Sequence, residues 1–524
     1  MTVTMTHTLN DLLSGFTMLS IETSPGHLFQ SLQMDSRKVQ SGDIFVATTC
    51  DASVDHIQAA IQSGAICVVL EQDLLQREGH VLSAILSNIP HVLVDNARKT
   101  LGILASRLYS RQPKVIYAVT GTNGKSSVVT FLRQMLGLLG YPAASYGTVG
   151  LETDVPSVCS LDLPKLTTLD ALSFHQLLDS LSSQGVEHFV FEASSHGLDQ
   201  YRLHQAKVTV AAFTNLTQDH LDYHETMDAY FEAKSRLFTQ ILVDGGTAVI
   251  NGGSPYAKPL ELMLQDRDIT VLTYGVTAAS GAGFDIEARS VRLEPGSIHF
   301  DLYQYGGLVC PCRLSIVGDF QVENILCVVG MVLGALNQGR SVPLSLKDIL
   351  GNSTQSDLLS QLTSARGRME FAGEGRTGAA IYVDYAHTPD ALSRSLQALR
   401  LHLVNTGGRL HLVFGCGGNR DALKRHQMGQ IAHELADQVI VTDDNPRDED
   451  PEFIRAQILS GCPDALGIPD RHMAIRRAIE SLGQGDILLV AGKGHETGQI
   501  IRGKVFPFDD VAVIEELLES HSEL

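Results

Sequence analysis

AVTGTNGKSSVV, residues 118–129, lies between two segments whose apolar residues are spaced differently. Residues 115–120 form a short run of β-branched and aromatic side chains, which is typical of a buried strand. After the quoted stretch, apolar residues recur at helical spacing until Gly140-Tyr-Pro142 interrupts them. The sequence therefore predicts a strand, a tight glycine loop and a helix, in that order.

The loop has the composition of a phosphate-binding site. Gly121 and Gly124 allow backbone N–H groups to turn inward, and the start of the helix adds partial positive charge. Lys125 can neutralise phosphate oxygens, and Ser126 can offer its hydroxyl to Mg²⁺. The strict P-loop pattern has a glycine where this chain has Val119, so we interpret G-T-N-G-K-S as a shortened variant.

Length and composition bound the class of protein. A chain of 524 residues predicts about three domains of roughly 150 residues each. The net charge of -20 argues against non-specific nucleic-acid binding, because no basic stripe is present. The eight cysteines lack a C-x-x-C pair and predict reduced thiols in a cytoplasmic protein. We see no signal peptide, and the longest uncharged apolar stretch, residues 327–336, is too short to insert into a membrane.

Strand-like and helix-like segments alternate along the whole chain. Such β-α alternation implies an α/β fold with parallel sheets, in which ligands bind beyond the carboxyl ends of the strands. A small α/β unit is expected first, and composition changes near residues 112 and 365. We therefore predict three domains, covering residues 1–112, 113–365 and 366–524.

Three polar residues of the central segment could serve a metal or a phosphate. Glu192 ends an apolar strand and is a natural oxygen ligand for Mg²⁺, although a solvated carboxylate would fit the same position. His220 could complete a metal shell or be an ordinary loop histidine. Lys234 lies on a predicted helix with an aromatic face, and the pattern alone favours an exposed lysine.

Three charged residues of the last segment each follow a separate predicted strand: Arg420, Arg447 and Glu496. Guanidinium groups pair with carboxylates and a glutamate pairs with an ammonium group. Together these residues could bind a ligand that carries both carboxylates and an amine. Taken singly, each is better explained as a surface charge.

The order of motifs carries more information than any one of them. The motifs are GTNGKSS, EASSHGLDQYR, TNLTQDHLDYH, YFEAKSRLF, GRMEF, VDYAHTPDAL, DNPRDEDP and AGKGHE. From about Asp35 to the C-terminus, this order resembles the Mur ligase family, and within it the members that add the third peptide residue to the cell-wall precursor. The resemblance implies a small N-terminal α/β domain, a central P-loop ATPase-like parallel-sheet domain and a C-terminal Rossmann-like domain.

The resemblance also implies a reaction. A carboxylate of UDP-N-acetylmuramoyl-L-alanyl-D-glutamate would attack the γ-phosphate of ATP, and the amine of an incoming amino acid would displace phosphate from the resulting acyl phosphate. Mg²⁺ and fixed cations would bring the two anions together. Closure of the last domain over the nucleotide would keep water from the acyl phosphate.

By motif, the resemblance assigns roles to individual residues. The catalytic set would be Lys125, Glu192, His220 and Lys234, and CO₂ would convert Lys234 into a carbamate. The metal set would be Ser126, Glu192, His220 and the Lys234 carbamate. ATP would contact Gly121, Thr122, Asn123, Gly124, Lys125, Ser126, Ser127, Asn324, Arg368, Asp384 and His387. The UDP-muramoyl peptide would contact Met34, Ser36, Thr167, Thr168, Ser194, Gln200 and Arg202. The amino acid would contact Arg420, Asp444, Asn445, Pro446, Arg447, Gly492 and Glu496.

Arg447 predicts which amino acid is added. In the family an arginine here accompanies meso-diaminopimelate, whose distal end carries a carboxylate beside its ammonium group. L-Lysine lacks that carboxylate, and an arginine facing a bare ammonium would be both repelled and unpaired. We therefore predict the diaminopimelate-adding type.

Three departures from the family pattern concern Leu169, where proline is usual, Gln321, where asparagine is usual, and Cys50, near which a glycine is missing. The alternatives are a lysine-adding enzyme, a D-alanyl-D-alanine-adding relative, folylpolyglutamate synthase and a catalytically silent regulator. The first domain and SSHGLDQ argue against the synthase. Retention of the four catalytic residues argues against the regulator. We expect a monomer.

Overall fold

The structure is a computed structural model. It describes residues 8–16, 18–19, 28–48, 54–158, 163–277, 283–294, 296–350, 358–404 and 407–522, so Cys50 and the adjoining residues 51–53 lie outside it. The chain divides into two compact units. The first comprises Met1–Asn123, Gly140–Ala248 and Lys258–Val271, and the second Gly124–Leu139, Val249–Ala257 and Leu272–Leu524.

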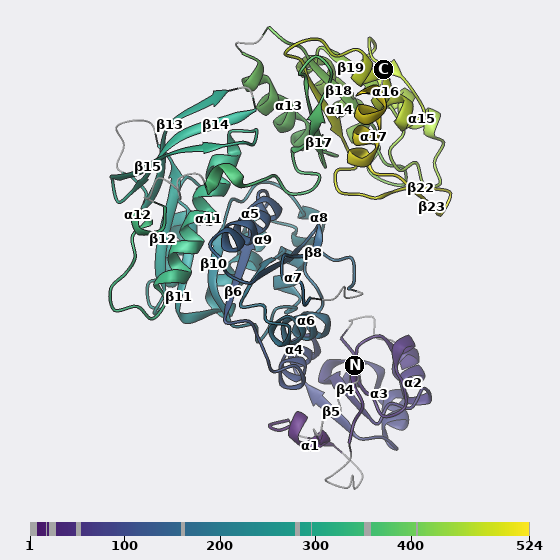
Figure 1. The fold of residues 1–524 in the computed structure, drawn as a ribbon. Coiled ribbons are helices and arrows are strands. Elements are labelled where there is room, and N and C mark those ends of the chain that lie inside the picture. Colours follow the sequence, from purple (N-terminus) through teal and green to yellow (C-terminus); the bar gives the residue numbers. More distant parts are fainter. Residues whose placement is uncertain are drawn as a thin grey trace. The chain divides into compact units, whose positions relative to one another are not determined.

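The first unit begins with a five-stranded sheet in the order β1-β5-β4-β3-β2 (Figure 1). The last four strands are parallel, and β1 runs antiparallel to β5. Their buried aliphatic side chains pack under the flanking helices. This is the small α/β unit that the sequence predicts. Its elements are α1 (Leu9–Leu12), β1 (Met18–Leu19), β2 (Leu32–Gln33), β3 (Ile44–Val46), α2 (Val54–Gln62), β4 (Cys67–Glu71), α3 (Gln72–Leu86), β5 (His91–Val94) and α4 (Ala97–Leu108).

The same unit holds the parallel part of a second sheet, in the order β10-β6-β9-β7, with β8 antiparallel at the edge. Each parallel strand is almost wholly buried, as expected for a sheet covered on both faces. Their carboxyl ends meet at one edge of the sheet. The elements are β6 (Val115–Thr120), β7 (Ala143–Gly147), β8 (Gly150–Thr153), α6 (Ala171–Ser183), β9 (His188–Glu192), α7 (Ser195–Asp199), β10 (Val208–Phe213), α8 (Leu221–His224), α9 (Met227–Arg236) and α10 (Ala257–Leu264).

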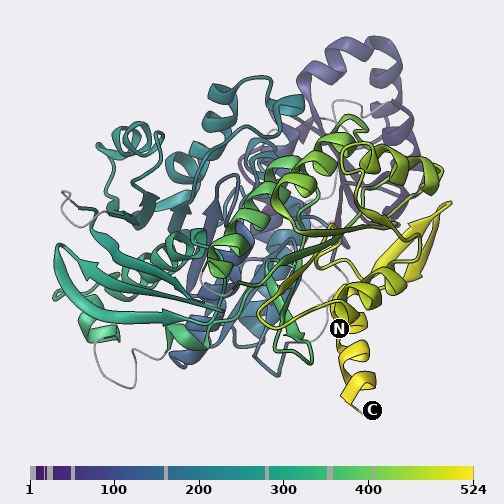
Figure 2. The same ribbon diagram turned by 90° about the horizontal axis from the view of Figure 1, so that it is seen from above.

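Strands β11 (Leu242–Asn251) and β12 (Thr270–Val276) contribute residues to both units and continue this sheet, which has ten strands in all. It ends in an antiparallel meander of β13 (Ile286–Glu294), β14 (Ser297–Gln304) and β15 (Gly307–Leu314), drawn in teal in Figure 2. In the second unit, α5 (Lys125–Leu138) packs against α11 (Phe320–Asn337), and α12 (Leu346–Leu350) follows.

Helix α11 is apolar from Ile325 to Leu336. Within the described residues it is the one helix long and apolar enough to cross a membrane, by length and composition only. However, 72% of its 18-residue window is buried inside the protein. Its packing against α5 identifies α11 as a core helix.

The third sheet has the order β16-β17-β21-β18-β19-β20 and is parallel except for the β16–β17 pair. Separate hydrophobic cores cover its two faces, which is the doubly wound arrangement expected of a Rossmann-like domain. We keep the boundaries near residues 112 and 365 as a prediction. The elements are β16 (Glu370–Glu374), β17 (Ala380–Asp384), α13 (Pro389–Leu403), β18 (Leu410–Phe414), α14 (Leu423–Leu435), β19 (Gln438–Val441), α15 (Pro451–Leu459), β20 (Leu466–Gly467), α16 (Arg471–Glu480), β21 (Ile487–Ala491), the hairpin β22 (Gly498–Ile501) with β23 (Lys504–Pro507), and α17 (Asp510–Ser522).

Acid should destabilise the first unit through His175 of α6. This side chain is fully buried, its Nε2 donates to the His204 carbonyl 2.8 Å away, and burial lowers its pKa from 6.5 to about 4. The unfolded chain therefore binds a proton that the folded chain excludes, and stability falls as the pH drops from 6.5 towards 4. We expect a loss of about 2 kcal/mol between pH 7 and pH 5 from this histidine.

Chemical denaturation of the parent and of His175→Gln at both pH values measures this effect. The variant should be less stable at pH 7 but should lose less of its stability on acidification. Equal pH dependence of the two proteins would contradict the assignment.

Candidate active site

The phosphate loop joins β6 to α5, as the sequence predicts. Gly121 has φ +151°, and a Cβ at this position would overlap Thr214 Oγ1. Gly124, the N-cap of α5, has φ +86°. Both conformations favour glycine, which explains the spacing of glycines in the loop. The helix then starts at Lys125, followed by buried Ser126.

Replacing Gly121 by alanine should disrupt this loop. The new methyl group meets the side chain of Thr214 and the backbone of Asn215, and the backbone conformation is unfavourable for alanine. We expect a loss of about 1–3 kcal/mol in stability, together with weaker ATP binding. Thermal unfolding and a nucleotide titration check both effects. Gly245→Ala is the matched control, because that exposed glycine also has positive φ but nothing within 4 Å of its would-be Cβ.

The first half of the loop is held by the segment after β10. The backbone N–H groups of Thr122 and Asn123 donate to Asn215, at 2.9 Å in each case, and Thr214 Oγ1 donates to the Asn123 carbonyl at 2.6 Å. These two N–H groups are therefore used inside the protein. The start of α5 carries the partial positive charge of a helix N-terminus, which suits phosphate.

Glu192 ends β9 and is only 2% exposed. Strand pairing sets it opposite Val119 of β6, two residues before the phosphate loop. Its Oε1 accepts the Thr148 N–H at 2.8 Å. A Cβ on Gly147 would overlap the carboxylate, so this glycine makes room for it. The solvated strand-end alternative is wrong, because the carboxylate is buried and oriented.

Lys234 is also buried, with 1% of the residue exposed. Its Nζ donates to the Gly121 carbonyl at 2.8 Å and lies 4.6 Å from the centre of the Tyr230 ring. The exposed lysine favoured by helical spacing alone is therefore wrong. The buried contact is with a residue 113 positions earlier in the chain, which the spacing within α9 does not reveal.

His220 occupies a left-handed backbone position, with φ +52°, and its side chain is 46% exposed. Its ring centre lies 5.1 Å from that of His196 and 6.1 Å from that of Tyr230. The Tyr230 hydroxyl in turn lies 3.3 Å from Thr122 Oγ1. His220 therefore belongs to an aromatic cluster beside the Lys234 helix.

The residues expected around the muramoyl peptide in the central domain form one connected group. Thr168 Oγ1 donates to Ser194 Oγ at 2.9 Å, and Arg202 Nη1 donates to the Thr168 carbonyl at 2.9 Å. Arg202 also donates to Gln200 Oε1 at 2.8 Å, while Thr167 Oγ1 lies 3.3 Å from Thr148 Oγ1. Leu169, where the family usually has proline, is buried.

Two expected contacts lie in the N-terminal sheet region. Ser36 is buried in the short 3₁₀ turn Ser36–Lys38, and Met34 is partly buried against the hydrophobic core there. Asp35 caps this turn, and its pairing with Arg37 lowers the pKa of Asp35 to about 2. The turn is therefore locally well fixed.

The two polar residues of the α11 start bind each other. Asn324 Nδ2 donates to Gln321 Oε1 at 2.8 Å, and both side chains are buried. The amide oxygen of Gln321, which stands where the family usually has asparagine, is therefore occupied by a hydrogen bond from Asn324.

Three residues expected to contact the nucleotide lie near the end of β17: Arg368, Asp384 and His387. Asp384 accepts from the Met369 N–H at 3.0 Å and from Ser395 Oγ at 2.7 Å. The guanidinium carbon of Arg368 lies 5.0 Å from the centre of the Tyr385 ring. His387 is next in chain order, and burial lowers its pKa.

DNPR, residues 444–447, follows β19 and packs closely on the glycines after β18. A Cβ on Gly418 would overlap the Pro446 carbonyl, and Arg447 Nη1 donates to the Gly418 carbonyl at 2.8 Å. Arg447 has φ +51°, a costly conformation for arginine. Two backbone hydrogen bonds hold it in this conformation. The Arg447 N–H donates to the Ile500 carbonyl at 2.9 Å, and the Arg447 carbonyl accepts from the Arg502 N–H at 2.7 Å.

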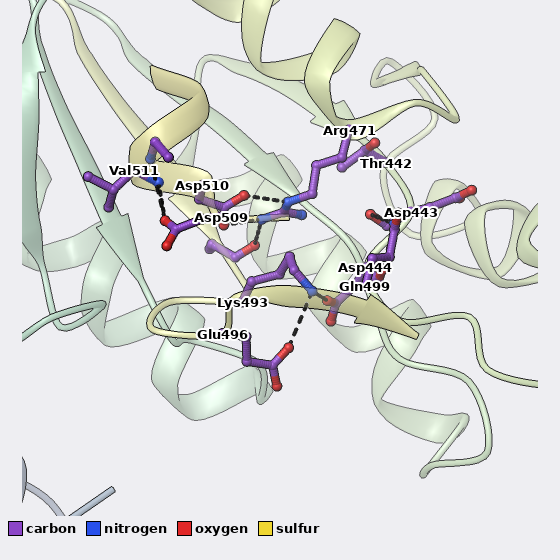
Figure 3. Close-up of polar contacts among 12 residues, drawn as sticks. Thr442, Asp443, Asp444, Arg471, Lys493, Glu496, Gln499, Asp509, Asp510 and Val511 are labelled. Carbon is purple, nitrogen blue, oxygen red and sulfur yellow. Dashed lines mark hydrogen bonds and ion pairs between the residues drawn. The ribbon is translucent and has the colours of Figure 1, made fainter. Parts of the chain in front are cut away.

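Asp444 of DNPR forms a charge cluster with buried Lys493 and partly exposed Glu496 (Figure 3). Lys493 Nζ lies 3.3 Å from Glu496 Oε2 and 3.5 Å from Asp444 Oδ1. Asn445 Nδ2 donates to the same Glu496 oxygen at 2.7 Å. Burial raises the pKa of Asp444. Gly492, with φ +113°, begins the turn that carries Lys493. The structure thus brings DNPR and AGKGHE into contact, whereas Arg420 is exposed.

Sequence reasoning missed Asn215 and Thr217, which support the phosphate loop, and Lys493. Thr217 N–H donates to Thr122 Oγ1 at 3.0 Å. Their positions in the sequence could have indicated them. Asn215 and Thr217 directly follow β10, the strand that pairs with β6, and Lys493 lies between two glycines.

Comparison with known proteins identifies the class. Residues 119–332 match the Mur ligase middle domain, and residues 367–494 match the Mur ligase, glutamate ligase domain. The chain belongs to the Mur ligase family, whose members are ATP-dependent, ADP-forming ligases.

Among its relatives are proteins named UDP-N-acetylmuramoyl-L-alanyl-D-glutamate--2,6-diaminopimelate ligase. The protein of that name from Bradyrhizobium diazoefficiens is 42% identical over 93% of this chain and 94% of its own. That from Rickettsia rickettsii is 38% identical over 94% and 96%. A solved structure under this name has 31% identity and a TM-score of 0.68, covering 99% of this chain and 100% of that one.

A more distant solved structure is that of a folylpolyglutamate synthase, one of the alternatives considered from the sequence. Mycobacterium tuberculosis folylpolyglutamate synthase is 18% identical, with a TM-score of 0.57, and covers 75% of this chain and 92% of its own. At this level of identity the likeness concerns the fold alone.

Proposed function

We propose that this protein is an ATP-dependent, ADP-forming ligase that adds meso-2,6-diaminopimelate to UDP-N-acetylmuramoyl-L-alanyl-D-glutamate in peptidoglycan precursor synthesis. The observation that carries the proposal is the identity of 38% and 42%, over almost complete chains, to two ligases of that name. The D-glutamate side-chain carboxylate takes the γ-phosphoryl group from ATP, giving ADP and an acyl phosphate. The amine then attacks the acyl carbon, phosphate leaves, and the amine loses a proton.

The phosphate loop and the segments of the last domain would hold ATP. Lys125 and the N–H groups at the start of α5 suit the phosphates, since a helix N-terminus carries partial positive charge. Asn324, Arg368, Asp384 and His387 would hold the rest of the nucleotide. Their local geometry supports this role, because Asp384 is fixed by two hydrogen bonds and Arg368 lies over an aromatic ring.

The donor chemistry of the chain suits Mg²⁺. Glu192 and Ser126 present the hard oxygen atoms that Mg²⁺ prefers, whereas the exposed imidazole of His220 suits it less well. Within the described part of the chain, no three His, Cys, Asp or Glu side chains gather to bind a metal. Phosphate oxygens and water would therefore complete the shell. When bound, Mg²⁺ would neutralise charge on the phosphates.

Lys234 would act as a carbamate formed with CO₂. The support is its position: a lysine that is almost wholly buried, with its Nζ on the carbonyl of the first phosphate-loop glycine. A carbamate there would convert a cationic side chain into an anionic oxygen donor. Glu192 would then share the charge of the metal with a second anion.

The substrate carboxylate and the incoming amine would be held by separate groups. Thr167, Thr168, Ser194, Gln200 and Arg202 form the connected group proposed for the muramoyl peptide, with Met34 and Ser36 for its uridine end. Asp444 to Arg447, Gly492 and Glu496, with Arg420, would bind diaminopimelate. Here Arg447 would pair with the distal carboxylate and Glu496 with an ammonium group.

The experiment is ADP release by purified protein supplied with ATP, Mg²⁺ and UDP-N-acetylmuramoyl-L-alanyl-D-glutamate, with either meso-diaminopimelate or L-lysine. We expect release that depends on all reactants and strongly favours diaminopimelate. Equal rates with both amino acids would refute the specificity, and no release with either would refute the function.

We further propose that the protein acts in the cytoplasm as a monomer, without nucleic acid or membrane insertion. Six cysteines in the described residues are free and buried, as suits a reducing compartment. Sedimentation of the purified protein at micromolar concentration tests the monomer. A dimer at that concentration would contradict this part of the proposal.

A further inference from the structure

Lys493 is a fully buried cation that the reaction outlined above does not use. The residue has no exposed surface, and it stands in the turn after β21. Its Nζ lies 3.5 Å from Asp444 Oδ1, 3.3 Å from Glu496 Oε2 and 3.3 Å from Asn445 Oδ1, as the close-up in Figure 3 shows for the two carboxylates. The ammonium group therefore touches two segments that lie about fifty residues apart in the sequence.

Burying an ammonium group costs several kcal/mol unless anions and hydrogen bonds surround it. Here two carboxylates share one ammonium, so this group of three has an excess negative charge. The neighbouring Arg471 does not cancel it, because Arg471 Nε and Nη2 each lie 2.7 Å from an oxygen of buried Asp510. The cluster is thus one cation short, which suits a ligand ammonium group.

The cluster is also fixed in orientation. Asn445 Nδ2 donates to Glu496 Oε2 at 2.7 Å, and Asn445 Oδ1 accepts the Ile500 N–H at 2.9 Å. Gln499 Nε2 donates to the Asp444 carbonyl at 2.8 Å. Asn445 Nδ2 also donates to Asp444 Oδ1 at 3.3 Å, so the Asn445 amide and the Lys493 ammonium group both hold the two carboxylates. Of these two groups, Lys493 is the one that carries a charge.

We propose that Lys493 is a positioning residue for the amino-acid substrate: its buried ammonium group holds the carboxylates of Asp444 and Glu496 in the orientation that receives the substrate's ammonium group. This inference rests on the proposed function, because it assumes that these residues bind diaminopimelate. Lys493 does not itself touch the reacting atoms.

Loss of the Lys493 charge should change the pH dependence of substrate binding. The charged groups with the largest effect on Asp444 are Lys493, Arg471, Glu496 and Asp510, and the titratable side chains of Tyr385, His387 and Cys416 also interact with it. Burial raises the pKa of Asp444, and Lys493 is the largest influence that lowers it. Without Lys493, Asp444 should bind a proton at higher pH and lose its attraction for an ammonium group. The defect should therefore grow as the pH falls.

The test is Lys493→Met in the full-length protein, with KM for diaminopimelate, KM for ATP and kcat measured from pH 6.5 to pH 9. We expect KM for diaminopimelate to rise about 30-fold at pH 7, and by a larger factor at pH 6.5 than at pH 9. KM for ATP and kcat at saturating diaminopimelate should stay within about threefold of the parent.

Asp486→Asn is the matched control for loss of a buried charge in the same domain. Asp486 accepts from His411 Nε2 at 3.0 Å and from the Arg409 N–H at 2.7 Å, at the opposite end of the β21–β18 pair from Lys493. This variant should lower stability without changing KM for diaminopimelate. If Lys493→Met does not fold, Lys493→Gln keeps a hydrogen-bond donor without the charge and should show the same pH trend.

Unchanged KM for diaminopimelate, or a rise that is equal at all pH values and shared by ATP, would overturn the positioning role while leaving the function intact. Lack of diaminopimelate-dependent ADP release by the parent would overturn the proposed function and this inference together. In an Asp444→Asn background, Lys493→Met should add no pH dependence. Added dependence there would overturn the link through Asp444.

Discussion

Lys234→Ala is expected to lower the rate of ADP formation on the order of 10²- to 10³-fold, the range found when one preorganised electrostatic group is removed from a reacting centre. The physical reason is the position of Nζ, 2.8 Å from the Gly121 carbonyl within a buried site. Alanine removes both this contact and any carbamate that CO₂ would form there. Initial rates at saturating concentrations of all reactants measure the loss.

Two further measurements separate the carbamate from the plain ammonium group. Added formate or acetate supplies a carboxylate and should restore part of the activity of Lys234→Ala if the carbamate is the active form. Lys234→Arg keeps a cation and should not recover. Lys207→Ala, at an exposed lysine of the same unit, serves as control and should match the parent. Full activity of Lys234→Ala under ambient CO₂ would contradict the role.

Arg447→Ala is expected to cost about 2 kcal/mol or more in apparent affinity for diaminopimelate, or about a 30-fold rise in KM. The Gly418 carbonyl and the two backbone hydrogen bonds from the β22 region hold this arginine in a left-handed conformation. A guanidinium group held in this way is preorganised to pair with a distal carboxylate. KM for ATP should not change.

L-Lysine provides an internal comparison, because it lacks the distal carboxylate. The variant should lose affinity for diaminopimelate but not for L-lysine, so the preference between the two should shrink. Arg476→Ala, an exposed arginine of α16 in the same domain, controls for loss of positive charge. An unchanged KM for diaminopimelate in Arg447→Ala would count against Arg447 as the specificity residue.

Local pattern was enough to predict the framework of the site. The strand at residues 115–120, the glycine loop and the helix that ends before Gly140 all occur as expected, because their signals lie within a short stretch of sequence. The position of Glu192 at a strand end was predictable for the same reason. Parallel pairing then places its strand beside β6.

The remaining features of the site depend on contacts between segments far apart in the sequence, which the spacing of apolar residues within one helix or strand does not encode. Lys234 has the spacing of an exposed residue, yet it is buried with its Nζ on the Gly121 carbonyl, 113 residues earlier in the chain. Asn215 supports the phosphate loop through a strand pair distant in sequence. The motif set, through the family resemblance, indicated a role for Lys234, but it gave no reason to single out Lys493.

Transfer of labelled oxygen is the most direct test of carboxylate activation by ATP. UDP-N-acetylmuramoyl-L-alanyl-D-glutamate labelled with ¹⁸O in the D-glutamate side-chain carboxylate is incubated with ATP, Mg²⁺ and meso-diaminopimelate, and the released phosphate is analysed by mass spectrometry. An acyl phosphate intermediate predicts one ¹⁸O atom in each phosphate ion and one in the new amide. Unlabelled phosphate, formed at the same rate as the amide product, would contradict the account.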